Sequence, residues 1–263
     1  MNIKLGISTC PNDTYIFGPM IKGFLESDIT FELVMDDVEA LNKLALENVL
    51  DIVKVSYGVV PKVLDNYRIL KAGGALGFGC GPIVVSMNYS HERDLADKII
   101  GVPGFNTTAF RIFKEFYSSK NNSFVELRFD KIIKELVKKK IDVGVLIHEG
   151  RFIYQNYGLN KICDLGEKWE DKYNAPIPLG AILVKKNLSD RSDYFNRLIR
   201  ESIKFSKNNY NKIEPFIKEN AQELDDNIIR QHIEYFVTNY SVNVTPAMEM
   251  LTKFIGCDSS YFV

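Results

Sequence analysis

The sequence predicts an α/β protein with two lobes, and three features carry this prediction. Apolar β-prone segments alternate with helical segments over most of the 263 residues, which favours parallel sheets covered by helices. Two segments rich in glycine or proline, at 71–87 and 174–186, lead into apolar strands. The chain between them has a β–α alternation of its own. We therefore expect a discontinuous first lobe of residues 1–84 and 186–263, and a second lobe of residues 85–185.

The expected strands are short apolar runs bounded by turn residues. They cover residues 3–8, 30–35, 51–55, 67–71, 80–87, 98–102, 124–129, 141–147, 161–164 and 180–186. Helical patterns fit between most of these strands and dominate from about residue 190 to residue 256. We expect this helical tail to pack on a sheet that the earlier strands form.

Composition limits the class of protein. A hydrophobic share of 46% and a charged share of 25% are typical of a soluble globular chain. With a net charge of −1 and no basic face interleaved with aromatic residues, a nucleic-acid partner is not expected. The chain has no apolar run of about 18 residues, which argues against a membrane span. A strand pattern begins at Ile3 without a preceding signal sequence, so we expect a cytoplasmic protein.

The cysteines and the glycine-rich segment suggest no metal and no cofactor. The four cysteines form no C-x-x-C pair, and none has a histidine at metal-ligand spacing in the sequence. The motif GFGCGP at 77–82 differs from the dinucleotide-binding pattern G-x-G-x-x-G. Pro82 would also block the helix start that such a site requires. We read this segment as a loop.

Four strand ends are followed by small polar residues and a helical pattern. They are STCPNDT (8–14), KVSYG (54–58), VPGFNTTAF (102–110) and LIHEGRF (146–152). Ligands of open α/β sheets bind beyond the carboxyl ends of the strands. Two of these junctions fall in each expected lobe, so we expect a small-molecule site in a cleft between the lobes. Helix N-termini and hydroxyl groups suit an anion, although a single junction could equally serve helix capping.

These segments together resemble the 1,4-dihydroxy-6-naphthoate synthase family of the futalosine route to menaquinone. The resemblance rests on CPNDTYIF (10–17), DVEALNKLAL (37–46), KVSY (54–57), GGALGFGCGP (73–82), VPGFNTTA (102–109), IHEGRFIYQNYGL (147–159) and PIPLGAI (176–182). One departure is Lys168, where members of the family often carry an aromatic residue. The resemblance implies a periplasmic-binding-protein-like type II fold, with two lobes and a ligand cleft between them.

The resemblance also implies a reaction. The substrate would be cyclic dehypoxanthine futalosine, and a carbon–carbon lyase step of the retro-aldol type would yield 1,4-dihydroxy-6-naphthoate without a metal or redox cofactor. The substrate carries a carboxylate, which needs an anion site, and a sugar hydroxyl that must lose a proton. We expect the substrate to bind at the polar junctions, through Asn12, Asp13, Lys54, Val55, Ser56, Thr107 and Thr108.

A base that acts near neutral pH is most simply a histidine. His91 lies in a polar stretch and is predicted to be a surface residue. His232 shares a helical face with Ile229 and Phe236 and is predicted to pack in the core. His148 follows the apolar run VGVLI at the end of a strand, and the resemblance matches it to the family's proposed base.

Several alternatives remain open at this stage. Glu149 and Arg151 could support His148 or could simply be solvated charges, and Asp13 or Glu149 would be the next candidates for the base. The sister pathway enzyme chorismate dehydratase shares the architecture, although CPNDT favours the naphthoate synthase. A non-catalytic anion-binding receptor would normally be exported, and a ligand-sensing regulator would normally carry a DNA-binding domain. The sequence does not indicate the oligomeric state.

Overall fold

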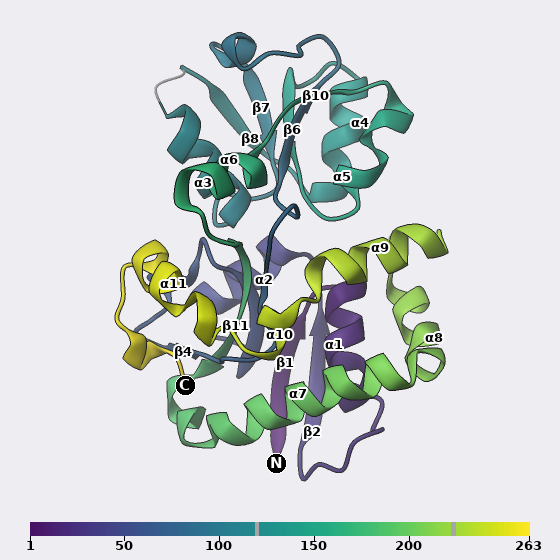
Figure 1. The fold of residues 1–263 in the computed structure, drawn as a ribbon, viewed down its shortest axis with the longest axis vertical. Coiled ribbons are helices and arrows are strands. Elements are labelled where there is room, and N and C mark those ends of the chain that lie inside the picture. Colours follow the sequence, from purple (N-terminus) through teal and green to yellow (C-terminus); the bar gives the residue numbers. More distant parts are fainter. Residues whose placement is uncertain (119–120, 222–224) are drawn as a thin grey trace. The chain divides into compact units, whose positions relative to one another are not determined.

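The computed structural model describes residues 1–118, 121–221 and 225–263, and the chain divides into two compact units. Unit 1 contains Met1–Gly77 and Pro178–Val263, and unit 2 contains Phe78–Ile177 (Figure 1). The first segment of unit 1 ends at Gly77 rather than at the expected residue 84, and the second begins at Pro178 rather than at residue 186. The reason is that strand β6 (Ile83–Ser86) pairs within the sheet of unit 2, whereas β11 (Ile177–Lys185) pairs within the sheet of unit 1.

The sheet of unit 1 has the strand order β2-β1-β3-β11-β4, and β5 pairs with β11. Its other strands are β1 (Asn2–Ile7), β2 (Thr30–Met35), β3 (Ile52–Ser56), β4 (Tyr67–Ile69) and β5 (Ala75–Gly77). β1 runs parallel to both β2 and β3, and β11 runs antiparallel to β3 and β4. The short strand β5 was not expected from the sequence.

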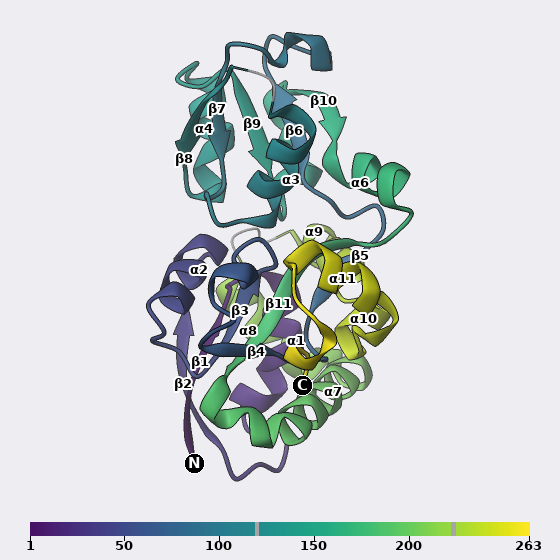
Figure 2. The same ribbon diagram turned by 90° about the vertical axis from the view of Figure 1, so that its left-hand side faces the viewer.

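Helices cover both faces of this sheet. They are α1 (Pro11–Ile21), α2 (Val38–Leu46), α7 (Ser192–Asn208), α8 (Tyr210–Asn220), α9 (Asp226–Phe236), α10 (Asn239–Val242) and α11 (Met248–Ile255). α1 packs against α7, α8 and α9 over a core that contains Leu5, Phe17 and Phe195. The opposite face of β1 is close-packed against α2, because a Cβ on Gly6 would meet Leu41. Figure 2 shows α2 and α7 on opposite sides of the sheet.

The sheet of unit 2 has the strand order β10-β6-β9-β7-β8. The remaining elements are β7 (Ile99–Val102), α3 (Thr108–Tyr117), β8 (Ser123–Glu126), α4 (Ile132–Val137), β9 (Val143–Leu146), α5 (Gly150–Ile153), β10 (Asn160–Asp164) and α6 (Leu165–Tyr173). Its core joins Ile83 and Val85 of β6 to Ile132 and Leu136 of α4. Short 3₁₀ turns complete the two units, at Val60–Lys62, Glu92–Leu95, Phe129–Lys131, Tyr154–Tyr157, Lys186–Arg191, Thr245–Ala247 and Ser259–Tyr261.

The expected parallel pairs are present in both sheets, but each sheet also contains antiparallel pairs and is therefore mixed. In unit 2, β7 runs parallel to β8 and β9, but β6 runs antiparallel to β9 and β10. The antiparallel strands include β6 and β11, which begin where the chain has just arrived from the other unit. Parallel neighbouring strands are usually joined by a crossover helix. Neither β6 nor β11 follows such a helix from a neighbouring strand of its own sheet, so both can run antiparallel to their neighbours.

The expected strands are otherwise confirmed, each within a few residues of its expected bounds, and so is the helical tail after β11. Among the described residues, no helix is long and apolar enough to cross a membrane.

Candidate functional site

In unit 1, the turn from β1 into α1 is organised around the buried carboxylate of Asp13. One carboxylate oxygen accepts hydrogen bonds from the Lys54 ammonium and from Asn12 Nδ2, the latter at 2.9 Å. The other oxygen accepts from the Ser8 backbone N–H at 3.0 Å and from the Ser8 hydroxyl at 2.6 Å. Four donors therefore occupy the carboxylate, which makes Asp13 a supporting anion rather than a free base.

Lys54 brings a positive charge to the same place from β3. Its side chain is 6% exposed, and its ammonium has three donors, of which Asp13 takes one. The stem of Lys54 passes over Gly180 of β11, where a Cβ atom would come within 2.8 Å of Lys54 Cε. A glycine at that position therefore leaves room for the lysine side chain. Two N–H groups of Lys54 remain to bind an anionic or carbonyl oxygen.

Ser56 lies on the same face of β3 as Lys54, because alternate residues of a strand share a face. Its backbone N–H donates to Asn42 Oδ1 at 2.9 Å, and its hydroxyl accepts from Asn42 Nδ2 at 3.4 Å. The hydroxyl hydrogen of Ser56 thus stays available as a donor. Val55 lies between these residues with its side chain on the opposite, fully buried face, paired in register with Ala181. Val55 contributes packing and backbone pairing.

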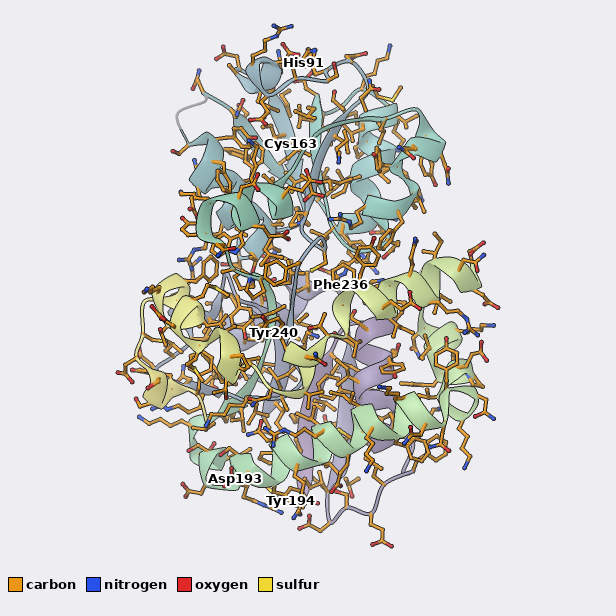
Figure 3. The ribbon with its side chains drawn as sticks, viewed as in Figure 1. His91, Cys163, Asp193, Tyr194, Phe236 and Tyr240 are labelled. Carbon is orange, nitrogen blue, oxygen red and sulfur yellow. The ribbon has the colours of Figure 1, made fainter. Side chains whose placement is uncertain are left out.

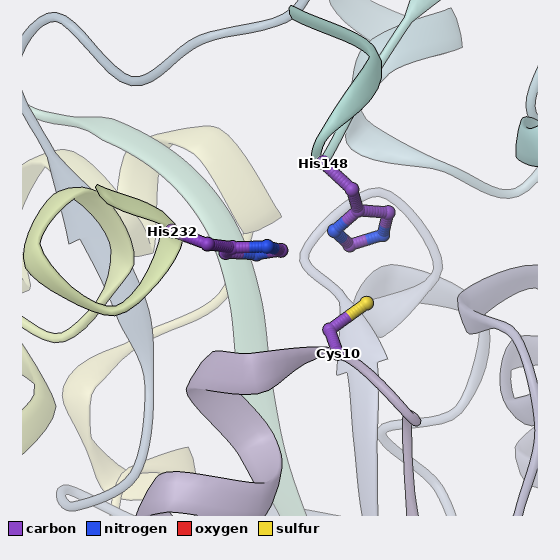
Figure 4. A group of neighbouring side chains, drawn as sticks. All are labelled: Cys10, His148 and His232. Atoms are coloured by element: carbon purple, nitrogen blue, oxygen red, sulfur yellow. The ribbon is translucent and has the colours of Figure 1, made fainter. Parts of the chain in front are cut away.

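Cys10 and His232 come together in unit 1, although they lie near opposite ends of the sequence. Cys10 is the N-cap of α1, and a ring nitrogen of His232 on α9 lies within 4.8 Å of its sulfur (Figure 4). Both residues are buried, and the His232 ring also contacts Phe236 edge-on at 4.6 Å. The predicted core position of His232 is confirmed. Its closeness to a cysteine has no signal in the sequence spacing.

In unit 2, Thr107 and Thr108 begin helix α3 at the end of β7. The Thr107 hydroxyl donates to Gly104 O at 2.7 Å and accepts from the Phe110 N–H at 3.2 Å. Its single hydrogen is therefore used inside the turn, as expected of an N-cap. Thr108 is the first helical residue and is buried. An anion at this junction would face the N-terminus of α3, where the Phe110 N–H is already bonded to Thr107.

His148 lies two residues beyond β9, in the short loop that precedes α5 (Figure 4). Its backbone has φ 53°, in the left-handed region that residues other than glycine rarely adopt. The ring of Phe129 contacts the imidazole edge-on, with 5.0 Å between centroids. Functional sites often retain such a conformation, although Asn48, Asp97, Lys139 and Asn174 also adopt it in this protein.

The third histidine, His91, and the two cysteines of unit 2 lack the features of a reactive group. His91 is exposed, as predicted (Figure 3). Cys163, also labelled in Figure 3, lies 3.2 Å from the Tyr117 hydroxyl, and burial raises the pKa of its thiol to about 11. Burial likewise raises the pKa of the Cys80 thiol to about 12. Both thiols therefore stay protonated near neutral pH and are unsuited to act as nucleophiles.

Sequence reasoning found the strand-end residues but not their supports. Asn42 belongs to a helix face and Gly180 to a strand, and neither type of position indicates a site by itself. In the sequence, these two residues were indicated only by the family resemblance, because they lie in the segments DVEALNKLAL and PIPLGAI that carry it.

Comparison with known proteins identifies the family. Residues 3–256 match the profile of a family described as menaquinone biosynthesis. A protein of Thermus thermophilus named 1,4-dihydroxy-6-naphthoate synthase is 36% identical over 243 residues, which cover 92% of this chain and 88% of the relative. A Streptomyces coelicolor protein of the same name is 34% identical over 249 residues, covering 92% of this chain and 87% of the relative.

Solved structures agree on the fold. A crystal structure of a protein from Archaeoglobus fulgidus has a TM-score of 0.89 at 30% identity, covering 97% of this chain and 95% of that one. The periplasmic aliphatic sulphonate binding protein of Escherichia coli has a TM-score of 0.67 at 7% identity, covering 97% and 90%. The second likeness shows only that the fold is periplasmic-binding-protein-like, as the sequence resemblance implied. From the profile match and the two named relatives, it follows that this chain belongs to the menaquinone biosynthesis family.

Proposed function

We propose that this protein converts cyclic dehypoxanthine futalosine into 1,4-dihydroxy-6-naphthoate by a base-initiated retro-aldol-type cleavage. The relatives that share its family bear the name of that synthase. The observation that carries the mechanism is the position of His148, a histidine held in a left-handed backbone conformation just beyond a strand end. Histidine can accept a proton near neutral pH, which the first step requires.

The proposed step is balanced without a cofactor. His148 takes the proton of a sugar hydroxyl, and the electron pair left on that oxygen forms a carbonyl as the adjacent carbon–carbon bond breaks. The electrons of the broken bond move to a carbonyl of the ring system, whose enol form is part of the aromatic product. The protonated imidazole then returns its proton to solvent or to the product.

The expected binding residues divide into two groups in this proposal. Lys54, Ser56, Asn12 and Thr108 would contact the substrate, because each has a side-chain group suited to an oxygen of the ligand. Asp13, Val55 and Thr107 would instead support the residues that contact the substrate. Asp13 holds Lys54, Val55 fixes the strand, and Thr107 caps the helix that begins at Thr108.

The test is direct turnover. The purified protein should convert the cyclic futalosine derivative to the naphthoate, detected by mass spectrometry, and His148→Asn should lower turnover by about 10²–10⁴-fold with little change in ligand affinity. His91→Asn is the matched control and should behave as the native protein, because His91 is exposed. Circular dichroism must first show that both variants are folded.

Three outcomes would contradict the proposal. Binding of the substrate without turnover would indicate a receptor, and turnover of chorismate in its place would indicate the sister enzyme. Near-native turnover in a folded His148→Asn variant would show that His148 is not the base.

A further inference from the structure

The loop that carries His148 has little regular structure of its own. It joins β9 to α5, a helix of only four residues, and the backbone N–H of Arg151 in α5 donates back to His148 O at 3.3 Å. A left-handed conformation at a residue other than glycine persists only when the surroundings hold it. The contacts that fix this loop therefore determine the direction of the imidazole.

The side chain of Arg151 supplies such contacts. One terminal nitrogen of its guanidinium donates to the carbonyl of Gly81, and the other donates to Asp164 Oδ2 at 3.0 Å. The Arg151 side chain is 13% exposed and that of Asp164 is 2% exposed, so water competes little for these bonds. A guanidinium can make two such bonds at once because its donors are fixed in one plane.

Both anchoring groups belong to a closely packed part of unit 2. The second carboxylate oxygen of Asp164 caps helix α6, accepting from the N–H groups of Gly166 and Glu167 at 2.8 and 3.3 Å. The backbones at Gly81 and Gly166 are in such close contact that a Cβ on Gly81 would lie 2.3 Å from Gly166 Cα. Arg151 therefore ties the loop to a point where the segment before β6 and the start of α6 already meet.

We propose that Arg151 is the positioning residue of this loop: by bridging Gly81 and Asp164 it sets the orientation in which His148 is presented. The inference rests on the proposed function of His148 as the base. Arg151 does not itself take part in proton transfer, since a guanidinium keeps its proton in proteins.

Arg151→Lys is the central variant, because lysine keeps the charge but cannot bridge two acceptors in the same way. We expect kcat to fall by about 10²-fold, since a displacement of about 1 Å costs that much, with KM within about twofold of native. Arg93→Lys is the matched control on an exposed arginine of the same unit, whose side chain is 81% exposed, and it should change neither constant. Unchanged kcat in Arg151→Lys, or a rise in KM alone, would overturn the inference.

Asp164→Asn provides a second variant in case Arg151→Lys does not fold. Asparagine keeps the oxygen that caps α6, but it presents an N–H₂ group to Arg151 in place of Oδ2. It should therefore reproduce the loss of kcat. Native kcat in a folded Asp164→Asn variant would contradict the inference.

Imidazole resonances give a readout that does not depend on turnover. In ¹⁵N-histidine-labelled protein the three histidines can be assigned with His148→Asn and His91→Asn. The His148 resonances should shift in Arg151→Lys and Asp164→Asn and stay in place in Arg93→Lys. If the native protein shows no lyase activity, the proposed function fails, but the shift still decides whether Arg151 positions His148. An unshifted His148 resonance in both variants would overturn the positioning role.

Discussion

The carboxylate of Asp13 illustrates how a single buried residue can organise the turn from β1 into α1. It receives two donors from Ser8, one from Asn12 and one from Lys54, and it is 1% exposed. A buried ion pair of this kind stabilises little by itself, but the loss of one partner leaves a buried charge uncompensated. The pair therefore keeps the Lys54 ammonium in place at the end of β3.

Asp13→Asn should consequently destabilise the protein by about 3–5 kcal/mol, because Lys54 would lose its counter-charge in a buried position. Chemical denaturation followed by circular dichroism measures this change. The double variant Asp13→Asn with Lys54→Met serves as the control and should recover most of the stability, since neither charge remains. A cost below about 1 kcal/mol for Asp13→Asn would show that Lys54 is solvated in solution.

Thr107 and Thr108 are neighbours with different expected roles. Thr108→Val should raise KM by about tenfold or more with a smaller effect on kcat, because a hydrogen bond to a charged group contributes about 1.5–3 kcal/mol. Thr107→Val should instead destabilise the protein by about 0.5–2 kcal/mol, because it removes the cap of α3.

Steady-state kinetics and thermal unfolding of both variants separate these effects. Thr108→Ser and Thr107→Ser keep the hydroxyl groups and should resemble the native protein. A native KM in Thr108→Val would place the carboxylate elsewhere, with Lys54 and Ser56 as the next candidates.

At the level of elements, β4 depends on a buried tyrosine. The Tyr67 hydroxyl donates to Leu50 O at 2.7 Å, and burial, together with the nearby Asp51, raises the pKa of Tyr67 to about 12. In the unfolded chain this hydroxyl ionises near its ordinary value of about 10. Between these values the unfolded chain has lost the proton and the folded protein retains it, so stability falls as pH rises from about 10 to 12.

Tyr67→Phe should reduce the free energy of unfolding by about 1–3 kcal/mol at neutral pH, because Leu50 O loses its donor in a buried place. The difference between variant and native protein should narrow as pH rises above about 10, where only the native protein has this tyrosine to ionise on unfolding. Urea titrations of both proteins at several pH values measure this difference in the free energy of unfolding. Parallel stability curves for the two proteins across this range would contradict the assignment.

On the scale of the whole molecule, the two units are built differently. Unit 2 is one continuous segment, Phe78–Ile177, with its own five-stranded sheet and its own core. Unit 1 is made of two segments, and β11 of the second segment pairs with β3 and β4 of the first. The complete sheet of unit 1 therefore needs both segments, which the continuous unit 2 separates along the chain.

A polypeptide of residues 78–177 should fold by itself, because its hydrogen-bonded sheet and hydrophobic core are internal to the segment. It should show dispersed amide resonances and a cooperative thermal transition. Residues 1–77 alone should remain unfolded, since they lack β11, which pairs with β3, β4 and β5 of their sheet. A disordered spectrum for residues 78–177 would show that unit 2 needs unit 1 in order to fold.

The sequence by itself determined the α/β class, nearly all the strands, the helical tail and the histidine at a strand end. These features are local, since hydrophobic periodicity and turn residues act over a few positions. The family resemblance was equally readable, because it rests on continuous segments such as CPNDTYIF and IHEGRF. The strand-end rule then brought Lys54, Ser56 and Thr108 into consideration without any coordinates.

Only the tertiary structure decided which side chains meet. Lys54 reaches Asp13 across 41 positions of the chain, and Arg151 reaches Gly81 across 70. Such pairings depend on strand order and on the direction of β6 and β11, which local patterns do not encode. The left-handed backbone of His148 was also invisible in the sequence, because a residue other than glycine adopts it only where packing and hydrogen bonds impose it.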